Sequence, residues 1–539
     1  MVNSMKLRSA VLVAAAWLAP AATAVDTTVN LTYSQYRGVA LANGVSQWLG
    51  MRYAAAPVGG LRFMPPQEPR PTSRLQMADK HGKYCLATDD DPGNNQTAED
   101  CLFLDVQAPT AATPQSRLPV FLYIQGGGFN ENANANVNAS GLVAASRFGI
   151  VVVSFNYRVG PYGFLTDGEG RVAANNGLRD QRKAMEWVQR HVGAFGGDPG
   201  HVVLGGSSAG AESVVLHMTA NNGTVPAFHG AIAESPSFAT TLTAAEAGYQ
   251  YRQLAVRLGC AGADSLACLR NKTAAEVQAE NVNVPLPGAA AAPKYMYVPV
   301  LDGDLVPDYT YRLLARGRLR PVPAILGDDS NGGTKFTPRA TATLAQSNQF
   351  MLDQYPFLTL DQLGQANRLY PNGNGSAACP GRRGCYWRQV SDVYGEARYM
   401  CPARAVTAAL VRAGVRRSFA YRWDVQDPAQ VAAGLGVPHT VELNALWGPE
   451  YAPRPPASYR KGGRNERASP LMQRYWTNFI RTLDPNDANQ TTAAWRPWSP
   501  DSQQRLVFQT GGEAQMEPFG DALNRRCDFW ADNGVSMRL

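Results

Sequence analysis

The chain has 539 residues, of which 45% are hydrophobic and 17% charged, and this balance excludes disordered and fibrous proteins. The formal net charge of +7 is mild for such a length, and no run of basic residues is interleaved with aromatic ones. We therefore expect a globular protein with a large core and no nucleic-acid partner.

The N-terminus has the three parts of a secretory signal peptide. Lys6 and Arg8 precede the apolar run 10–18, and the small residues 22–24 form a cleavage site. No later segment reaches the roughly 18 consecutive apolar residues of a membrane span, and the final residues lack a hydrophobic anchor. These features predict a signal peptide over 1–24 and a secreted protein with no stable membrane anchor.

Eight cysteines in an exported chain indicate a disulfide framework. Close neighbours along the chain pair at a low entropic cost, and elimination assigns the last pair. The predicted bridges are Cys85–Cys101, Cys260–Cys268, Cys379–Cys385 and Cys401–Cys527. Seven Asn-x-Ser/Thr sequons are candidate glycosylation sites: Asn30, Asn95, Asn138, Asn222, Asn271, Asn374 and Asn489.

Aliphatic runs alternate with helical patterns along the chain, which is typical of a mostly parallel sheet with helices on both faces. Between the second and third expected strands, apolar residues recur near the 3.6-residue period over 177–195, which predicts an amphipathic crossover helix. Two low-complexity patches, 131–140 and 285–294, are expected to be surface loops. Because expected strands lie on both sides of each patch, we predict a single α/β domain over 25–539 with insertions. The expected strands are 118–124, 149–155, 201–206, 230–235, 323–328 and 418–423.

A short segment, Gly206-Ser-Ser-Ala-Gly210, fits the pattern G-x-S-x-G, a sharp strand-to-helix turn that presents a serine at the top of a sheet. The pattern alone is a weak signal. Here it follows the expected strand 201–206 and opens a helical segment whose N-terminus stabilises negative charge. Only Ser208 occupies the central position, so it is the predicted nucleophile.

A second glycine-rich segment, 124–129, ends an expected strand upstream of this serine. Three glycines in a row either make a tight turn or expose backbone N–H groups to a reacting oxyanion, and their place after a strand favours the second reading. The predicted donors are the N–H groups of Gly127, Gly128 and Ala209.

The general base follows from the order of residues along the chain. In folds with this serine turn, the order is serine, acid and histidine. The chain has six histidines; three precede Ser208, and two more lie within its own helix or just after it. The remaining one, His439, is the predicted base, and we expect activity to fall below about pH 6–7 as it becomes protonated.

Together these segments resemble the type-B carboxylesterase/lipase family, the α/β-hydrolases that include cholinesterases and fungal lipases. The resemblance implies an α/β-hydrolase fold with a large, mostly parallel sheet and with insertions over the active site. It also implies hydrolysis of a small-molecule or lipid ester through an acyl-serine intermediate, without a metal or organic cofactor. It supports three of the four bridges, those other than Cys379–Cys385, and leaves the oligomeric state open. The segments that carry the resemblance are 50–63, 99–106, 122–129, 156–165, 195–213, 439–443 and 476–486.

Three positions depart from the family pattern. Ser207 stands where relatives commonly have Glu, and Gln125 stands where they often have His. The third departure concerns the triad acid, because the aligned position after the strand 323–328 is Gly332.

Four interpretations of the missing acid stay open at this point. Asp328 or Asp329 reaches in from the same loop, Glu234 supplies the acid from the preceding strand, Glu442 folds back from the histidine loop, or the site is a dyad. The gap also supports an alternative function, a binding module or a repurposed biosynthetic enzyme on the same scaffold. The retained serine, histidine and glycines favour an ester hydrolase instead.

Overall fold

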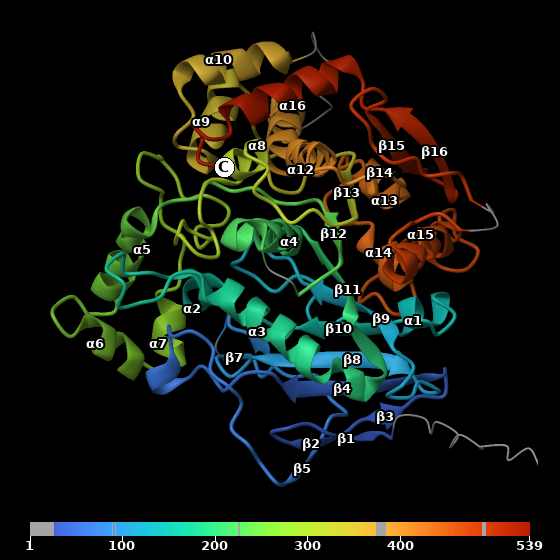
Figure 1. The fold of residues 1–539 in the computed structure, drawn as a ribbon. Coiled ribbons are helices and arrows are strands. Elements are labelled where there is room, and N and C mark those ends of the chain that lie inside the picture. The colour runs from blue at the N-terminus through green and yellow to red at the C-terminus, as the bar shows by residue number, and fades with distance from the viewer. Residues whose placement is uncertain (1–25, 89, 92, 225–226, 373–383, 488–491) are drawn as a thin grey trace, which may run out of the picture.

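A computed structural model describes residues 26–539 apart from 89, 92, 225–226, 373–383 and 488–491. In the described residues, the largest sheet has eleven strands and helices cover both of its faces (Figure 1). From one edge to the other, its strands are β16 (Glu513–Pro518), β15 (Gln504–Gln509), β14 (Ser418–Asp424), β13 (Ala324–Asp329), β12 (Gly230–Glu234), β11 (Gly197–Ser207), β9 (Leu118–Ile124), β10 (Val151–Phe155), β8 (Phe103–Pro109), β4 (Val45–Arg52) and β3 (Val39–Ala40).

The strands from β10 to β15 run parallel to their neighbours, and those beyond them on either side are antiparallel. All six strands expected from aliphatic runs lie in this parallel part, which confirms the mostly parallel sheet. Parallel strands place their carboxyl ends at one edge of a sheet, where ligand sites form. The serine turn follows β11 at that edge.

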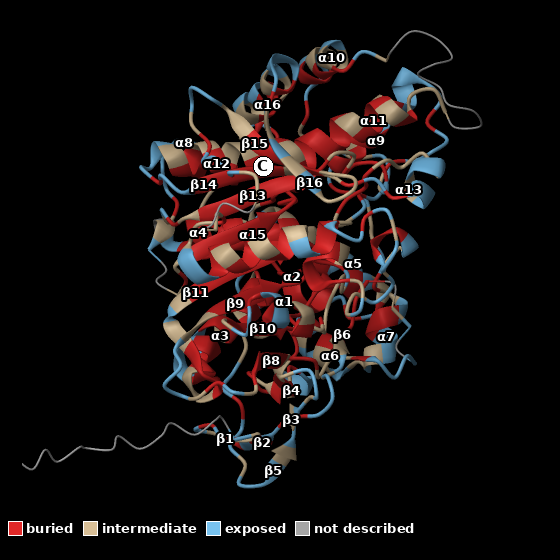
Figure 2. Cartoon of the chain, turned by 90° about the vertical axis from the view of Figure 1, so that its right-hand side faces the viewer, coloured by how far each residue is buried: buried red, intermediate tan, exposed pale blue. Residues whose placement is uncertain are grey.

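Side chains alternate between two separate cores. On β9, Val120 and Leu122 join the core on the side of α3, α4 and α12, whereas Phe121 and Tyr123 join the core on the side of α1, α14 and α15. Figure 2 shows the central strands coloured as buried, and α4 and α15 contact them at β11 and β9. The covering helices are α1 (Ser140–Ala145), α3 (Asn176–His191), α4 (Ala209–Thr219), α12 (Cys401–Arg412), α14 (Leu443–Trp447) and α15 (Ala468–Thr482). The expected crossover helix is therefore confirmed as α3, followed by the 3₁₀ turn η2 (Val192–Phe195).

The other helices and strands surround this framework. Between α11 and α12 the chain makes a π-helical turn, η5 (Glu396–Met400). The remaining helices are α2 (Gly160–Phe164), α5 (Ala244–Arg257), α6 (Ser265–Asn271), α7 (Ala274–Ala279), α8 (Thr310–Ala315), α9 (Leu344–Gln354), α10 (Leu360–Leu369), α11 (Trp387–Gly395), α13 (Pro428–Ala432) and α16 (Asp521–Asn533). Short 3₁₀ turns are η1 (Gly59–Leu61), η3 (Ala220–Gly223) and η6 (Ala457–Tyr459), and two small sheets hold β1 (Thr28–Asn30), β2 (Gln35–Arg37) and β5 (Leu75–Met77), and β6 (Tyr84–Cys85) and β7 (Thr97–Ala98).

Three of the predicted disulfides are formed, Cys85–Cys101, Cys260–Cys268 and Cys401–Cys527. The fourth prediction involves Cys379, which lies outside the described residues, as does the expected signal peptide. None of the helices in the described part of the chain has the length and apolar character needed to cross a membrane.

The described sequons differ in exposure. Asn30, Asn95 and Asn271 are exposed and Asn138 is half-buried. Asn374, Asn489 and the side chain of Asn222 lie outside what the structure describes. Glycosylation stays a prediction, as does the single domain over 25–539.

Candidate active site

The turn between β11 and α4 holds Ser208 in a strained conformation. Its φ of 58° and ψ of −123° lie in a region that side-chain-bearing residues rarely adopt. A Cβ on Gly206 would come within 2.6 Å of the Gly210 backbone, and a Cβ on Gly210 would overlap the carbonyl oxygen of Ile124. Glycine is therefore needed at both ends of the turn, which presents Ser208 at the N-terminus of α4.

Replacing Gly210 by alanine is expected to lower the free energy of unfolding by about 1–3 kcal/mol, because the added methyl group forces α4 away from the end of β9. Urea denaturation followed by circular dichroism measures this change. Gly193→Ala is a matched control, since no atom lies within 4 Å of its added Cβ. Equal stability of the two variants would contradict the tight contact.

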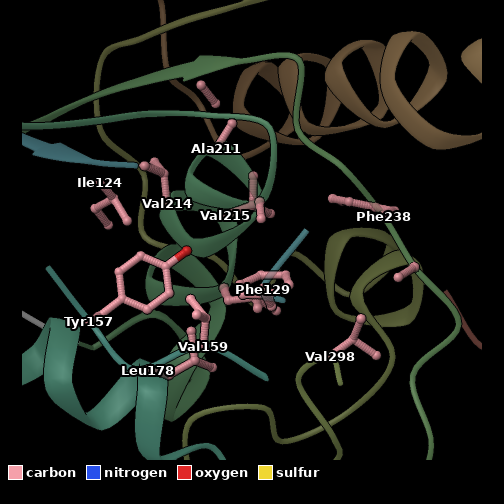
Figure 3. Close-up of a cluster of buried hydrophobic side chains, with 14 of the residues drawn as sticks. Ile124, Phe129, Tyr157, Val159, Leu178, Ala211, Val214, Val215, Phe238 and Val298 are labelled. Atoms are coloured by element: carbon pink, nitrogen blue, oxygen red, sulfur yellow. The ribbon is translucent and has the colours of Figure 1, made fainter. Parts of the chain in front are cut away.

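Helix α4 is anchored on all sides, because all of its residues are buried. Figure 3 shows Ala211, Val214 and Val215 of this helix among side chains that include Ile124 and Phe129. The N–H of Ser208 also donates to the carbonyl oxygen of Glu234, at 2.8 Å. The predicted nucleophile therefore stands on a rigid element, as a preorganised site requires.

The glycine loop after β9 lies directly against this turn. A Cβ on Gly126 would be 2.9 Å from the Cβ of Ser208. Gly127 and Gly128 have positive φ values of 115° and 59°. Glycine adopts this backbone conformation readily, whereas residues with a side chain rarely do. Within the described residues, the N–H groups of Gly127, Gly128 and Ala209 donate to no protein acceptor. Three unused donors thus lie around the serine.

His439 is brought to the same sheet edge by contacts to the end of β13 and the segment that follows it. The N–H of Thr440 donates to Asp329 at 2.7 Å, and Lys335 Nζ donates to the carbonyl oxygen of His439 at 3.0 Å. Asp329 also accepts from the hydroxyl of Ser235, at 3.4 Å. Ser235 directly follows Glu234, whose carbonyl oxygen accepts a hydrogen bond from the N–H of Ser208. These bonds link the loop that carries His439 to the turn that carries Ser208.

The imidazole of His439 is held by aromatic rings. It stacks on Tyr399 with ring centroids 4.0 Å apart and an interplanar angle of 28°, and it meets Phe336 nearly edge-on at 5.4 Å. Burial, together with the nearby cations Lys335 and Arg398, lowers the pKa of His439 well below 6.5. The ring is therefore neutral at pH 7 and available as a base.

Neither ring nitrogen of His439 has a hydrogen-bond partner in the described structure. The expected carboxylate is thus not bonded to the imidazole, and Ser208 Oγ is not bonded to it either. In structures without substrate such bonds are often long and tighten in the reacting complex. The absent bond to a triad acid has another cause, because Gly332 has no carboxylate that could come closer when substrate binds. A Cβ at Gly332 would lie 3.3 Å from the ring of Tyr399, the ring on which His439 stacks.

Two of the proposed acids, Asp329 and Glu442, form a buried pair. Burial raises the pKa of both carboxyl groups, and the charge of Glu442 raises that of Asp329 further. The hydroxyl of Tyr421 also donates to Glu442, at 3.3 Å. This pair supports the histidine loop through Thr440 and is not bonded to the ring of His439.

The other two proposed acids have partners of their own. Glu234 accepts a hydrogen bond from Trp476 Nε1 at 2.8 Å, and burial, then the charge of Glu442, raises its pKa. Burial raises the pKa of Asp328 to about 7, although the positive charges of Arg505 and Arg422 act to lower it. None of the four carboxyl groups therefore replaces the triad acid in this arrangement.

The two remaining departures from the family pattern have structural roles. Ser207 is fully buried, and its hydroxyl lies 3.0 Å from that of Tyr123. Gln125 Nε2 donates to Asn132 at 3.0 Å, which joins the start of the glycine loop to the segment after it. Both side chains support the loops around Ser208.

Sequence reasoning missed Arg398, Tyr399, Lys335 and Phe336 around the histidine. The first two lie in a helical run whose apolar spacing resembles that of an ordinary core helix. The sequence offered one signal for them, which is that Arg398 lies between Tyr394 and Tyr399 in a segment with a helical pattern.

Comparison with known proteins adds independent findings. A family model described as the carboxylesterase family matches residues 25–530. The acetylcholinesterase of Bungarus fasciatus is 27% identical over 516 residues, and the match covers 90% of this chain and 82% of that protein. The crystal structure of EstA from Aspergillus niger is similar with a TM-score of 0.90 and 38% identity, covering 96% of this chain and 99% of that one. The expected α/β-hydrolase fold is thus confirmed.

Proposed function

The chain belongs to the carboxylesterase family and is a carboxylic ester hydrolase, and from this premise we propose that it works through an acyl-enzyme intermediate on Ser208. The observation that carries the proposal is the set of unused N–H donors beside the strained serine. Such donors stabilise the negative charge that develops on a carbonyl oxygen under attack.

In the first half of the reaction, Ser208 Oγ attacks the acyl carbon while neutral His439 accepts the hydroxyl proton. The N–H groups of Gly127, Gly128 and Ala209 bind the oxyanion. The protonated imidazole then gives its proton to the leaving alcohol, which leaves an acyl-serine. In the second half, His439 takes a proton from water while the water oxygen attacks the acyl carbon. The protonated imidazole then returns this proton to Ser208 Oγ as the bond between Oγ and the acyl carbon breaks, which releases the acid product and regenerates Ser208.

We further propose that this site is a dyad. Tyr399 and Phe336 orient the imidazole by packing, a task that a carboxylate performs in a triad. They do not supply the negative charge that stabilises an imidazolium, and in the serine-protease example the loss of this interaction lowers the rate by about 10⁴-fold. We therefore expect slow turnover of simple neutral esters.

The acid limb of the pH profile is expected to lie below pH 6.5 rather than at about pH 6–7, because the pKa of His439 is lowered by burial and by two cations. As pH falls through that lowered value, the base becomes protonated and kcat/KM declines. Measuring kcat/KM for a neutral ester between about pH 4 and 9 tests this. A midpoint above 6.5 would mean that His439 is not the base or has an anionic partner.

A fluorophosphonate probe tests the acyl-enzyme proposal directly. Such a probe reacts with activated serines, so it should label the wild type at Ser208 and leave Ser208→Ala unlabelled, as read by mass spectrometry of the peptide. If the folded wild type stays unlabelled, the proposed mechanism is wrong. That result would favour the second candidate, a non-hydrolytic protein on this scaffold, for which Gly332 and the cations near His439 are the specific observations.

We also propose that the protein is secreted and acts on a small-molecule or lipid ester. The predicted signal peptide, the three disulfides and the exposed sequons support secretion. Expression of the full-length chain in a eukaryotic host should give a glycosylated product in the medium that begins near residue 25. Retention of the unprocessed chain in the cytosol would contradict this.

A further inference from the structure

Arg398 is a buried cation without an anionic partner in the part of the chain that the structure describes. Its Nε donates to the hydroxyl of Ser237 at 2.9 Å, while no described residue forms a hydrogen bond with Nη2. Four arginines of the described chain are almost fully buried, and the other three each form an ion pair, namely Arg62 with Glu99, Arg158 with Asp180 and Arg505 with Glu517. Arg398 forms no such ion pair, because no carboxylate oxygen of the described residues lies within 4 Å of its guanidinium nitrogens.

The surroundings of Arg398 stabilise its charge without neutralising it. The guanidinium carbon lies 5.7 Å from the ring centroid of Tyr295 and 5.8 Å from that of Tyr394. The carboxyl group that acts on this charge belongs to Glu212, whose pKa burial raises to about 8, so it is protonated at pH 7. A buried charge that stays unpaired is costly, which suggests that a ligand completes the site.

The position of Arg398 is inside the catalytic region. It lies on the π-helical turn η5, and such turns are frequent at functional sites. The next residue, Tyr399, stacks on His439. Tyr295, one of the rings near the guanidinium, is the side chain that a Cβ on Gly128 would overlap. Arg398 therefore lies between the proposed oxyanion loop and the proposed base.

Further hydrogen-bond donors accompany the guanidinium. Among the described residues, no hydrogen-bond partner lies within 3.5 Å and in suitable geometry for the hydroxyl groups of Tyr355 and Tyr394, on which the charge of Arg398 acts. A planar carboxylate accepts paired hydrogen bonds from a guanidinium and more from neighbouring hydroxyls. These unused donors fit a carboxylate better than a neutral group.

The same region lacks a negative charge that the reaction needs. When His439 accepts a proton, the charged groups acting on it are Lys335 and Arg398, both cations, and Gly332 supplies no carboxylate. An anion bound at Arg398 would neutralise one of these cations at the moment the imidazolium forms. Binding and chemistry would then both favour an anionic substrate.

We propose that the preferred substrate is an ester that also bears a carboxylate, such as the monoester of a dicarboxylic acid, and that Arg398 Nη2 binds this carboxylate. The proposal rests on the proposed function, because it names the substrate class of that same site. The ester is cleaved as described above, and the second carboxylate undergoes no reaction. Arg398 is thus a specificity-determining residue.

The test compares monoethyl esters of dicarboxylic acids of about four to eight carbons with the ethyl esters of the matching monoamides, which have the same shape and no charge. The wild type should show a kcat/KM about 10- to 100-fold higher for the best acid than for its amide, the range expected for hydrogen bonds to a charged group. Arg398→Gln should remove this preference, and Arg398→Lys should keep part of it. Arg320→Gln is the matched control, since Arg320 also lies over an aromatic ring, that of Phe228.

A second readout needs only the wild type. The free dicarboxylate of the best length should inhibit hydrolysis of a neutral ester competitively, and the corresponding diamide should not. Equal rates for acid and amide esters, or no difference between these inhibitors, would overturn the proposal. If those results are obtained and the fluorophosphonate still labels Ser208, only the substrate proposal is wrong and the proposed function stands. An unlabelled wild type would overturn the proposed function itself.

Arg398→Gln also has an expected effect on the pH profile. Removing this cation should raise the pKa of His439, because Arg398 is one of the charges that lower it. The acid limb for a neutral ester should move to higher pH. A variant that folds, loses the preference for acids and leaves the acid limb in place would contradict the position of Arg398 beside the base.

Discussion

Replacing Ser208 by alanine is expected to lower kcat/KM for ester hydrolysis by at least about 10³-fold. Without the hydroxyl no acyl-enzyme forms, and in a well-studied serine protease the loss of the nucleophile costs about 2 × 10⁶-fold in kcat. We expect a smaller factor here, because a dyad starts from a lower rate. The oxyanion donors remain in the variant and account for residual activity above water. Steady-state kinetics with an activated ester measures the effect.

The neighbouring serine provides a matched control. Ser207 is buried and its hydroxyl lies 3.0 Å from that of Tyr123, so it points away from the substrate side. Ser207→Ala should keep kcat/KM within about tenfold of the wild type, because one lost neutral hydrogen bond is worth about 1 kcal/mol. If Ser207→Ala removes activity and Ser208→Ala retains it, the assignment of the nucleophile is wrong.

Replacing Gly332 by glutamate is expected to increase kcat/KM for neutral esters by about 10- to 10³-fold, with the full value of a triad acid, about 10⁴-fold, as the upper bound. Gly332 has no positive φ, so its backbone accepts a side chain. The nearest atom to a new Cβ is in the ring of Tyr399, at 3.3 Å, and a shift of a few tenths of an ångström accommodates it. The new carboxylate would then lie near His439 and stabilise its imidazolium.

The same substitution should raise the pKa of His439, because a nearby anion favours the protonated ring. The acid limb of kcat/KM should therefore move to higher pH together with the gain in rate. Gly332→Gln is the control of equal size without the charge, and it should show neither effect. If Gly332→Glu folds and changes neither the rate nor the acid limb, the wild-type site already has an acid and the dyad proposal is wrong.

The parallel part of the sheet could be predicted because strands buried on both faces read as aliphatic runs. The edge strand β16 gave no such signal, since its residues are exposed or half-buried along its whole length. Strand β15 begins with Gln504 and Arg505 and ends with Gln509, which shortens its apolar run to three residues. Strands of this kind gain their order from pairing with neighbours, and a single sequence does not show which neighbours those are.

The nucleophile and the base could be predicted because chemistry restricts both the local turn and the order along the chain. Ser208 is marked by its flanking glycines, and His439 is the only histidine in the required position. The acid could not be assigned from the sequence, because four carboxylates were compatible with the expected order and strand ends, and only coordinates show that none is bonded to the ring of His439. Arg398 could not be predicted for another reason. It stands out because no described carboxylate forms an ion pair with it, and a sequence does not show which residues pair in the folded protein.

The contact between Gly210 and the carbonyl oxygen of Ile124 has a consequence for how substrate range can change. With no space for even a methyl group between them, the serine and its amide donors behave as one rigid block. Adaptation to a new acyl or alcohol group must therefore fall on segments outside this block. The histidine loop, η5 and the segment carrying Tyr295 are such segments, so divergence in chemistry at constant fold is expected to begin there.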